Sequence, residues 1–341
     1  MAPCSVCEIV PELYKPNSKL TCGHEFCADC YQRYVSGSLT ELKHHLRCSI
    51  CGELTILTQE VKDTCVHRFG RDLPPALREP KGIFWTSSGH FVITDTIHHR
   101  VFVFDENKNS VVDFAYIHGC EVQNGVLLTN DGHVVIPLSD TKYVNLAYYN
   151  IDGELRGTLF LKPNTHITGM TLTTNGDILA ADGPNQCVYR IDSTRKIVHT
   201  LKVNKRPEEH FVPYPHGVAG GQDGGIIVTD TANNRVRVYD DKDEVFDIFG
   251  SSGERPGQFK NPTNVVLCDN GNILITDTCN HRIQMFTSRG RFLQFFLQYN
   301  EGEDVFMAPV ALAIKRNILA VLLKGKPEVQ AGEVRLYKVT T

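Results

Sequence analysis

Short runs in which apolar and polar residues alternate fill the chain from about residue 80 onwards. In residues 235–239, for example, Val236 and Val238 alternate with longer polar or aromatic side chains. Successive side chains of a β-strand point to opposite faces, so a period of two predicts strands with one buried face. Asp-Gly and Asn-Gly pairs, as at residues 131–132 and 270–271, favour tight hairpins between such strands. No segment shows an apolar period of 3.6, which argues against a helical solenoid.

The pattern of strands and turns repeats six times along the chain. Three strong copies contain Thr-Asp-Thr, with the aspartates at Asp95, Asp230 and Asp277. Three copies are weaker, and of these the second and sixth rest on spacing alone; the six key positions are 95, 138, 182, 230, 277 and 321. A unit of this length holds four short strands. Six such units predict an all-β, six-bladed β-propeller.

A propeller must close its ring, and the sixth unit ends before it can form a fourth strand. Residues 334–339 are its third predicted strand, and only residues 340–341 follow it. Residues 65–70 end in Phe-Gly, as does the last predicted strand of the fourth unit, residues 245–250. We therefore expect the strand at 65–70 to complete the sixth blade. The predicted organisation is a small module at 1–54, a linker at 55–63 and a propeller at 64–341.

The composition describes a soluble globular chain. Of its 341 residues 41% are hydrophobic and 22% are charged, and its net charge is −4. No run approaches the roughly 18 apolar residues of a membrane span, and the first residues do not resemble a secretory signal. Seven of the twelve cysteines lie within the first 51 residues. This clustering predicts metal binding in a reducing compartment, hence a cytoplasmic protein, with the nucleus as the alternative.

The first 51 residues contain four pairs of metal-ligand residues. The eight candidate ligands are Cys4, Cys7, Cys22, His24, Cys27, Cys30, Cys48 and Cys51. A gap of two residues lets one turn present two thiolates to the same ion, and a structural zinc takes four such ligands in a tetrahedron. Eight ligands make two sites with no open position. The sequence therefore predicts two structural zinc ions, which supply much of the folding energy of so small a module.

The order of three cysteines, one histidine and four cysteines resembles the RING family at every position. The resemblance implies interleaved sites, in which Cys4, Cys7, Cys27 and Cys30 hold one zinc, and Cys22, His24, Cys48 and Cys51 hold the other. The alternative is another double-zinc fold, such as a differently threaded treble-clef finger.

RING modules bind a ubiquitin-conjugating enzyme that carries ubiquitin as a thioester, and they favour its reactive posture without covalent chemistry of their own. The family's contact positions correspond here to Val6, Tyr34 and Ile50, whose alternative role is to pack the module. Many active RING modules have a basic residue just after the last cysteine, whereas this chain has Gly52 and Glu53. That departure weakens the expectation of strong activation, though not of docking.

The repeats resemble the NHL repeat, whose pattern includes Asp-x-x-Asn-x-Arg followed by Val or Ile. Residues 230–236 and 277–283 match it, and residues 95–101 match it with His98 in place of asparagine. A RING module joined to NHL repeats, without room for a B-box or a coiled coil, is similar to RING–NHL ubiquitin ligases. The resemblance implies that the propeller recruits a protein substrate for ubiquitination and proteasomal degradation.

Propeller geometry predicts which face binds the substrate. In a four-stranded meander, the turns between second and third strands lie on the same face as the loops between blades, and such loops are the usual binding elements. The predicted members of this face are residues 96–100, 139–145, 183–187, 231–235, 278–282, 324–333, 203–215 and 250–262. Arg100, Arg235 and Arg282 are interpreted as internal braces to the repeated aspartates rather than as a basic patch. His98, His99, His216 and His281 lack metal spacing and are interpreted as surface or turn residues.

Two other functions compete with substrate recruitment. Some RING–NHL proteins bind single-stranded RNA on a basic propeller face, which makes an RNA-binding or protein-binding adaptor with little ligase activity the alternative. Residues 71–341 hold 28 Lys and Arg against 31 Asp and Glu, a balance that disfavours RNA. A propeller enzyme is also conceivable, but no cluster of catalytic residues is present in the sequence.

Overall fold

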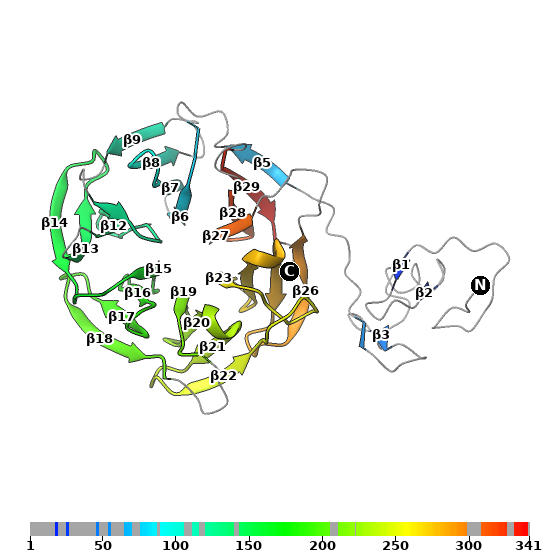
Figure 1. The fold of residues 1–341 in the computed structure, drawn as a ribbon. Helices are drawn as coiled ribbons and strands as arrows, with labels where there is room; N and C mark the ends of the chain where they lie inside the picture. Colours follow the sequence, from blue (N-terminus) through cyan, green and yellow to red (C-terminus); the bar gives the residue numbers. More distant parts are fainter. Residues whose placement is uncertain are drawn as a thin grey trace.

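The computed structural model is a six-bladed β-propeller preceded by a short N-terminal region (Figure 1). It describes residues 18–19, 25–26, 46–47, 54–55, 65–69, 76–86, 89–105, 111–115, 120–139, 143–204, 211–221, 223–298, 308–325 and 331–339. Each blade is an antiparallel sheet, and the sheets follow one another around a ring in chain order. The fold class predicted for the repeats is thereby confirmed.

The first three blades follow the predicted meander. Blade one contains β6 (Pro80–Trp85), β7 (His90–Asp95), β8 (Arg100–Asp105) and β9 (Val111–Ala115). Blade two contains β10 (Glu121–Val122), β11 (Leu127–Leu128), β12 (Val134–Ser139), β13 (Val144–Tyr149) and β14 (Leu155–Phe160). Blade three contains β15 (Ile167–Leu172), β16 (Ile178–Asp182), β17 (Cys187–Ile191) and β18 (Ile197–Lys202). The innermost strand of blade two is split, because β10 and β11 both pair with β12.

The last three blades have the same strand order. Blade four contains β19 (Pro215–Gly220), β20 (Ile226–Asp230), β21 (Arg235–Tyr239) and β22 (Val245–Phe249). Blade five contains β23 (Pro262–Leu267), β24 (Ile273–Asp277), β25 (Arg282–Phe286) and β26 (Phe292–Gln298). Blade six contains β27 (Ala308–Lys315), β28 (Ile318–Lys324), β29 (Glu333–Lys338) and, from far upstream, β5 (Cys65–Phe69).

The pairing of β5 with β29 closes the ring. The register opposes Val334 to Phe69 and Leu336 to His67, so the outer strand of blade six comes from the segment before blade one. Phe69 then contacts blade one, since its ring centroid lies 5.4 Å from that of Phe91 and 5.2 Å from that of Phe104. The closing strand is therefore held both by backbone pairing and by aromatic packing.

Six apolar clusters hold neighbouring blades together, one at each interface among the described residues. On the axis, the innermost strands approach backbone to backbone around a channel of about 200 Å³. A Cβ at Gly82 would lie 2.9 Å from the backbone of Gly125, and one at Gly217 would lie 2.7 Å from Asn264 Cα. Glycine is therefore required at these positions for the close approach of the blades.

One of the six key positions is wrong, and it lies in blade six. Leu323, rather than residue 321, pairs there with Pro309 and Glu333, as Asp95 pairs with Pro80 and Arg100 in blade one. Blade six lacks the aspartate at this position, so spacing alone did not fix the register.

Two short hairpins belong to the N-terminal module: β1 (Ser18–Lys19) pairs with β2 (Glu25–Phe26), and β3 (Leu46–Arg47) pairs with β4 (Leu54–Thr55). The helices η1 (Thr231–Asn233) and η2 (Thr278–Asn280) are single turns. No helix in the described ranges is long and apolar enough to cross a membrane.

Candidate functional site

The predicted zinc ligands and docking residues all lie outside the described residues. This holds for Cys4, Cys7, Cys22, His24, Cys27, Cys30, Cys48 and Cys51, and for Val6, Tyr34 and Ile50. In the sequence, one ligand pair stands between β1 and β2, and another stands between β3 and β4. The geometry of the site can therefore be built only for the propeller.

We call the propeller face that carries the turns between second and third strands and the loops between blades the turn face. In blades one, three, four and five, the second strand ends there in a fully buried aspartate. Each of these aspartates accepts a hydrogen bond from the backbone just before the first strand of its own blade. The donors are Glu79 N to Asp95 (3.1 Å), His166 N to Asp182 (3.2 Å), Tyr214 N to Asp230 (3.0 Å) and Lys260 N to Asp277 (2.7 Å).

The residue three positions after each aspartate contacts the same carboxylate. Asn185 Nδ2, Asn233 Nδ2 and Asn280 Nδ2 donate to their aspartates at 2.7, 3.0 and 2.8 Å. In blade one His98 Nδ1 lies 2.8 Å from Asp95 Oδ2, so the histidine takes the place of asparagine. The Asp-x-x-Asn pattern thus ties a turn, a strand end and an incoming loop to one buried carboxylate.

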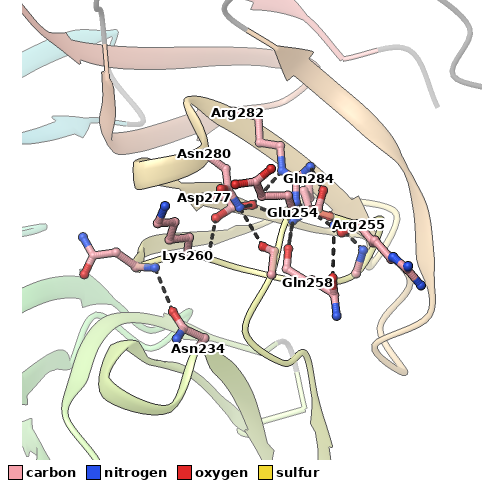
Figure 2. Close-up of polar contacts among 12 residues, drawn as sticks. Asn234, Glu254, Arg255, Gln258, Lys260, Asp277, Asn280, Arg282 and Gln284 are labelled. Carbon is pink, nitrogen blue, oxygen red and sulfur yellow. Dashed lines mark hydrogen bonds and ion pairs between the residues drawn. The ribbon is translucent and has the colours of Figure 1, made fainter. Parts of the chain in front are cut away.

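Blade five shows how firmly such a tie fixes a loop (Figure 2). Arg282 Nε donates to Asp277 Oδ2 at 2.7 Å, and its terminal nitrogens donate to the carbonyl oxygens of Glu254, Arg255 and Gln258. Gln284 Nε2 donates to the same Gln258 oxygen at 2.7 Å. The loop between blades four and five is thereby held at three carbonyls by buried side chains.

Blade four has a buried arginine brace that was not among the predicted ones. In blade four, Asp230 is paired with Arg237, whose Nη2 lies 2.8 Å from Oδ2. Arg237 is 1% exposed and also donates to Asn204 O, whereas Arg235 is half-buried. Arg235 and Arg282 occupy the same place in the repeat. The partner of the aspartate can therefore shift by two residues along the third strand, which keeps it on the same face of the sheet.

Large apolar side chains are exposed on the turn face among these pinned loops. Ile97, Tyr143 and Phe211 are 49%, 53% and 63% exposed, and each follows or precedes a strand end on this face. Phe160, the last residue of β14, is 63% exposed and lies edge-on to Tyr143, with ring centroids 6.2 Å apart. Such groups, held on a rigid frame, favour contact with another protein.

The interpretation of His216 as a surface or turn residue is wrong. It lies in β19 and lines the channel at the turn-face end, where its Nδ1 is 2.7 Å from Thr263 O and its Nε2 is 3.3 Å from Asn124 Nδ2. Burial lowers the pKa of His216 to about 4, against the effect of the Thr263 carbonyl, so the ring is neutral near pH 7. The described residues contain no group of three or more His, Cys, Asp or Glu side chains that could hold a metal ion.

Comparison with known families identifies both parts of the chain. The model for the C3HC4-type zinc finger, or RING finger, matches residues 4–51, and the model for the NHL repeat matches residues 213–239 and 259–286. This chain carries a RING finger followed by NHL repeats. The NHL matches fall on blades four and five, the two blades whose sequences carry the full Asp-x-x-Asn-x-Arg pattern.

Solved structures share the propeller fold at low sequence identity. Virginiamycin B lyase from Staphylococcus aureus is 12% identical, with a TM-score of 0.54, 79% of this chain covered and 98% of that chain. Regucalcin, a calcium-binding protein from Agrobacterium tumefaciens, is 12% identical, with a TM-score of 0.57 and coverage of 77% and 90%. At this identity the likeness shows the fold alone. A search of curated proteins found no match.

Proposed function

We propose that this chain is a RING-type ubiquitin ligase whose propeller recruits a protein substrate. The observation that carries the proposal is the match of residues 4–51 to the RING finger, ahead of a propeller whose turn face presents pinned loops and exposed apolar side chains. Its layout, a RING finger joined directly to six propeller repeats, resembles that of malin. We place its action in the cytoplasm and expect ubiquitination to lead to proteasomal degradation.

The donor set of the RING finger fits zinc. Seven thiolates and one imidazole are the ligands of structural tetrahedral sites, and eight donors fill two sites without leaving a position for water. In the proposed assignment Cys4, Cys7, Cys27 and Cys30 hold one ion, and Cys22, His24, Cys48 and Cys51 hold the other. The metal orders the module, and neither ion takes part in ubiquitin transfer.

In the proposed mechanism, Val6, Tyr34 and Ile50 form an apolar patch that docks the ubiquitin-conjugating enzyme. The thioester between that enzyme and ubiquitin is then attacked by a lysine of the substrate held on the propeller. No covalent intermediate forms on this chain. The propeller's contribution is proximity, because a bound substrate meets the thioester at a high effective concentration.

A protein substrate is supported over RNA by the exposed side chains of the turn face. Ile97, Tyr143, Phe160 and Phe211 are large and apolar, and the chain as a whole is slightly acidic. A face that binds RNA without a protein partner relies on lysine and arginine to neutralise phosphates.

The test is autoubiquitination by the purified full-length chain with a panel of ubiquitin-conjugating enzymes. We expect ubiquitin conjugates with at least one enzyme, and their loss when Val6→Ala and Ile50→Ala are combined while zinc content stays unchanged. Conjugation that persists in the double variant would show that the docking patch is wrong. A zinc-loaded chain that is inactive with every enzyme would favour the RNA-binding adaptor, and binding of labelled single-stranded RNA would then be measured.

A further inference from the structure

A pocket of about 190 Å³ lies between blades two and three, on the face opposite the turn face. Its wall contains the turns between first and second strands of both blades and the turn between β17 and β18. Tyr148 and Arg195 line it, together with Asp131 and Asp192. A cavity of roughly 150 Å³ holds a benzene molecule, so this pocket has room for a small ligand or for one side chain of a partner.

Arg195 is held in a backbone conformation that arginine rarely adopts. Its φ is +64°, in the left-handed region. It closes its turn at the place where blades two and five have Gly153 and Gly290 and blade four has Asp243. Glycine adopts this conformation without strain and aspartate tolerates it, whereas a long side chain is disfavoured there. Strained residues of this kind cluster at functional sites.

The next interface around the ring shows what occupies the same place elsewhere. Between blades three and four, His199 of β18 contacts Asp243 of the following turn, side chain to side chain. In blade two the place of His199 is taken by Gly157, which lies opposite Tyr148 in the sheet. A Cβ on Gly157 would clash with Nη1 of Arg195. The missing side chain therefore makes room for the guanidinium between the two blades.

The guanidinium of Arg195 has no carboxylate partner among the described residues. Its Nη1 donates to Arg156 O at 3.0 Å, and its Nη2 lies 3.5 Å from His133 Nε2. Its central carbon lies 4.4 Å from the centre of the Tyr148 ring. A guanidinium carries five N–H groups, so these contacts leave donors for a ligand.

The hydroxyl of Tyr148 is a second donor without a partner. The side chain is 3% exposed, and its hydroxyl has no hydrogen-bond partner among the described residues. Burial raises the pKa of Tyr148 to about 12, against the effect of Arg195 and with that of Asp131 and Asp192, so the hydroxyl stays protonated. The charges that act on it are thus those that line the pocket. Folded proteins satisfy nearly all buried polar groups, so this hydroxyl calls for an acceptor from outside the chain.

The lining offers both donors and acceptors to a ligand. Arg195 and Tyr148 donate, whereas the carboxylates of Asp131 and Asp192 accept. An anionic ligand would face two carboxylates, and a cationic ligand would face the guanidinium. A neutral group that accepts at one atom and donates at the next meets both requirements, and the primary carboxamide is the simplest planar group of this kind.

We propose that the pocket between blades two and three binds a neutral primary carboxamide. The carbonyl oxygen of the ligand accepts from the Tyr148 hydroxyl and the Arg195 guanidinium, and its nitrogen donates to Asp131 or Asp192. The carboxamide belongs to a small free amide or to a glutamine or asparagine side chain of a bound protein. The site goes beyond the proposed ligase function, because it lies on the face opposite the one assigned to the substrate.

The experiment uses the full-length, zinc-loaded chain and three probes of the same shape. Propionamide is neutral, propionate is anionic and propionamidine is cationic near neutral pH. Dissociation constants are measured by titration with saturation-transfer difference NMR. We expect propionamide to bind in the millimolar range and each charged probe to bind at least about tenfold more weakly.

Tyr148→Phe removes only the hydroxyl. It should weaken propionamide binding about three- to tenfold, the worth of one hydrogen bond, while the midpoint of thermal unfolding stays the same or rises. Tyr189→Phe is the matched control in blade three. Tyr189 is 2% exposed and its hydroxyl donates to Asp182 at 3.0 Å, so this variant should lower the midpoint and leave the affinity unchanged. Arg195→Gly, which introduces the residue of blades two and five, should weaken binding at least about tenfold.

Blocked tripeptides with the sequences Ala-Gln-Ala and Ala-Glu-Ala distinguish the two sources of the carboxamide. If the glutamine peptide binds as tightly as propionamide, the occupant is a protein side chain, and if only propionamide binds, it is a free amide. Three results would overturn the site. They are the absence of saturation transfer to any probe, which would leave solvent as the occupant, equal or tighter binding of a charged probe or of the glutamate peptide, and equal affinity of the wild type and Tyr148→Phe.

Discussion

Removing the guanidinium of Arg282 should destabilise the propeller far more than removing that of Arg235, although both occupy the same place in the repeat. Arg282 is 5% exposed, and it donates to the Asp277 carboxylate and to three loop carbonyls. Its guanidinium carbon also lies 4.6 Å from the centre of the Phe295 ring. Arg235 is half-buried, and the buried partner of its aspartate is Arg237.

The size of the effect follows from what Arg282→Ala leaves behind. Breaking a buried ion pair by removing one member costs about 3–5 kcal/mol, because the other charge stays buried. Asp277 keeps the donors Asn280, Gln284 and Lys260 N, so we expect the lower end, about 3 kcal/mol. Arg237→Ala should cost a similar amount. Arg235→Ala should cost less than about 1 kcal/mol, as part-exposed ion pairs do.

Denaturant unfolding measures these differences in free energy. The chain has one tryptophan, Trp85, which is 8% exposed in blade one, so its fluorescence reports on the propeller and not on the RING finger. The three variants are compared with the wild type in urea near neutral pH. If Arg235→Ala proves as destabilising as Arg282→Ala, the network of blade five does not carry the stability assigned to it.

Three further predictions concern other parts of the chain. Elemental analysis should find two zinc ions in the purified wild-type chain and fewer in Cys27→Ala, which lacks one ligand. An unchanged zinc content in the variant would contradict the RING assignment. Phe69→Ala should reduce the free energy of unfolding by about 2–3 kcal/mol, because it weakens the closure of the propeller ring. His67 is exposed on the same strand, so His67→Ala should reduce it by much less. Equal effects would show that aromatic packing of Phe69 does not stabilise the closure. The lowered pKa of His216, about 4, means that between about pH 6.5 and 4 the unfolded chain binds a proton that the folded chain does not. The free energy of unfolding should therefore fall as the pH is lowered across this range, and His216→Gln should flatten the fall; an unchanged pH profile would contradict the burial of this ring.

Much of the propeller could be predicted from the sequence because the same residues mark the same strand ends in several repeats. Asp95, Asp230 and Asp277 mark strand ends that depend on one local set of hydrogen bonds, and the copies of that set are similar in sequence. Blade six has Leu323 at the place of the aspartate, and there the prediction slipped by two residues.

Features that depend on contacts between blades could not be predicted in the same way. Arg237, two residues after Arg235, is a buried brace of Asp230, and the repeat pattern does not contain it. His216 follows a proline like a loop residue, yet it lines the channel beside Asn124, 92 residues earlier in the chain.

The central claim, that this chain activates a ubiquitin-conjugating enzyme, is tested most directly by single-turnover discharge. A conjugating enzyme charged with ubiquitin is mixed with free lysine, with and without the purified zinc-loaded chain, and the decay of the thioester is followed on non-reducing gels. The account predicts faster decay with the chain present, and a return to the unstimulated rate when Val6 and Ile50 are both replaced by alanine. Decay at the unstimulated rate across a full panel of conjugating enzymes would contradict it.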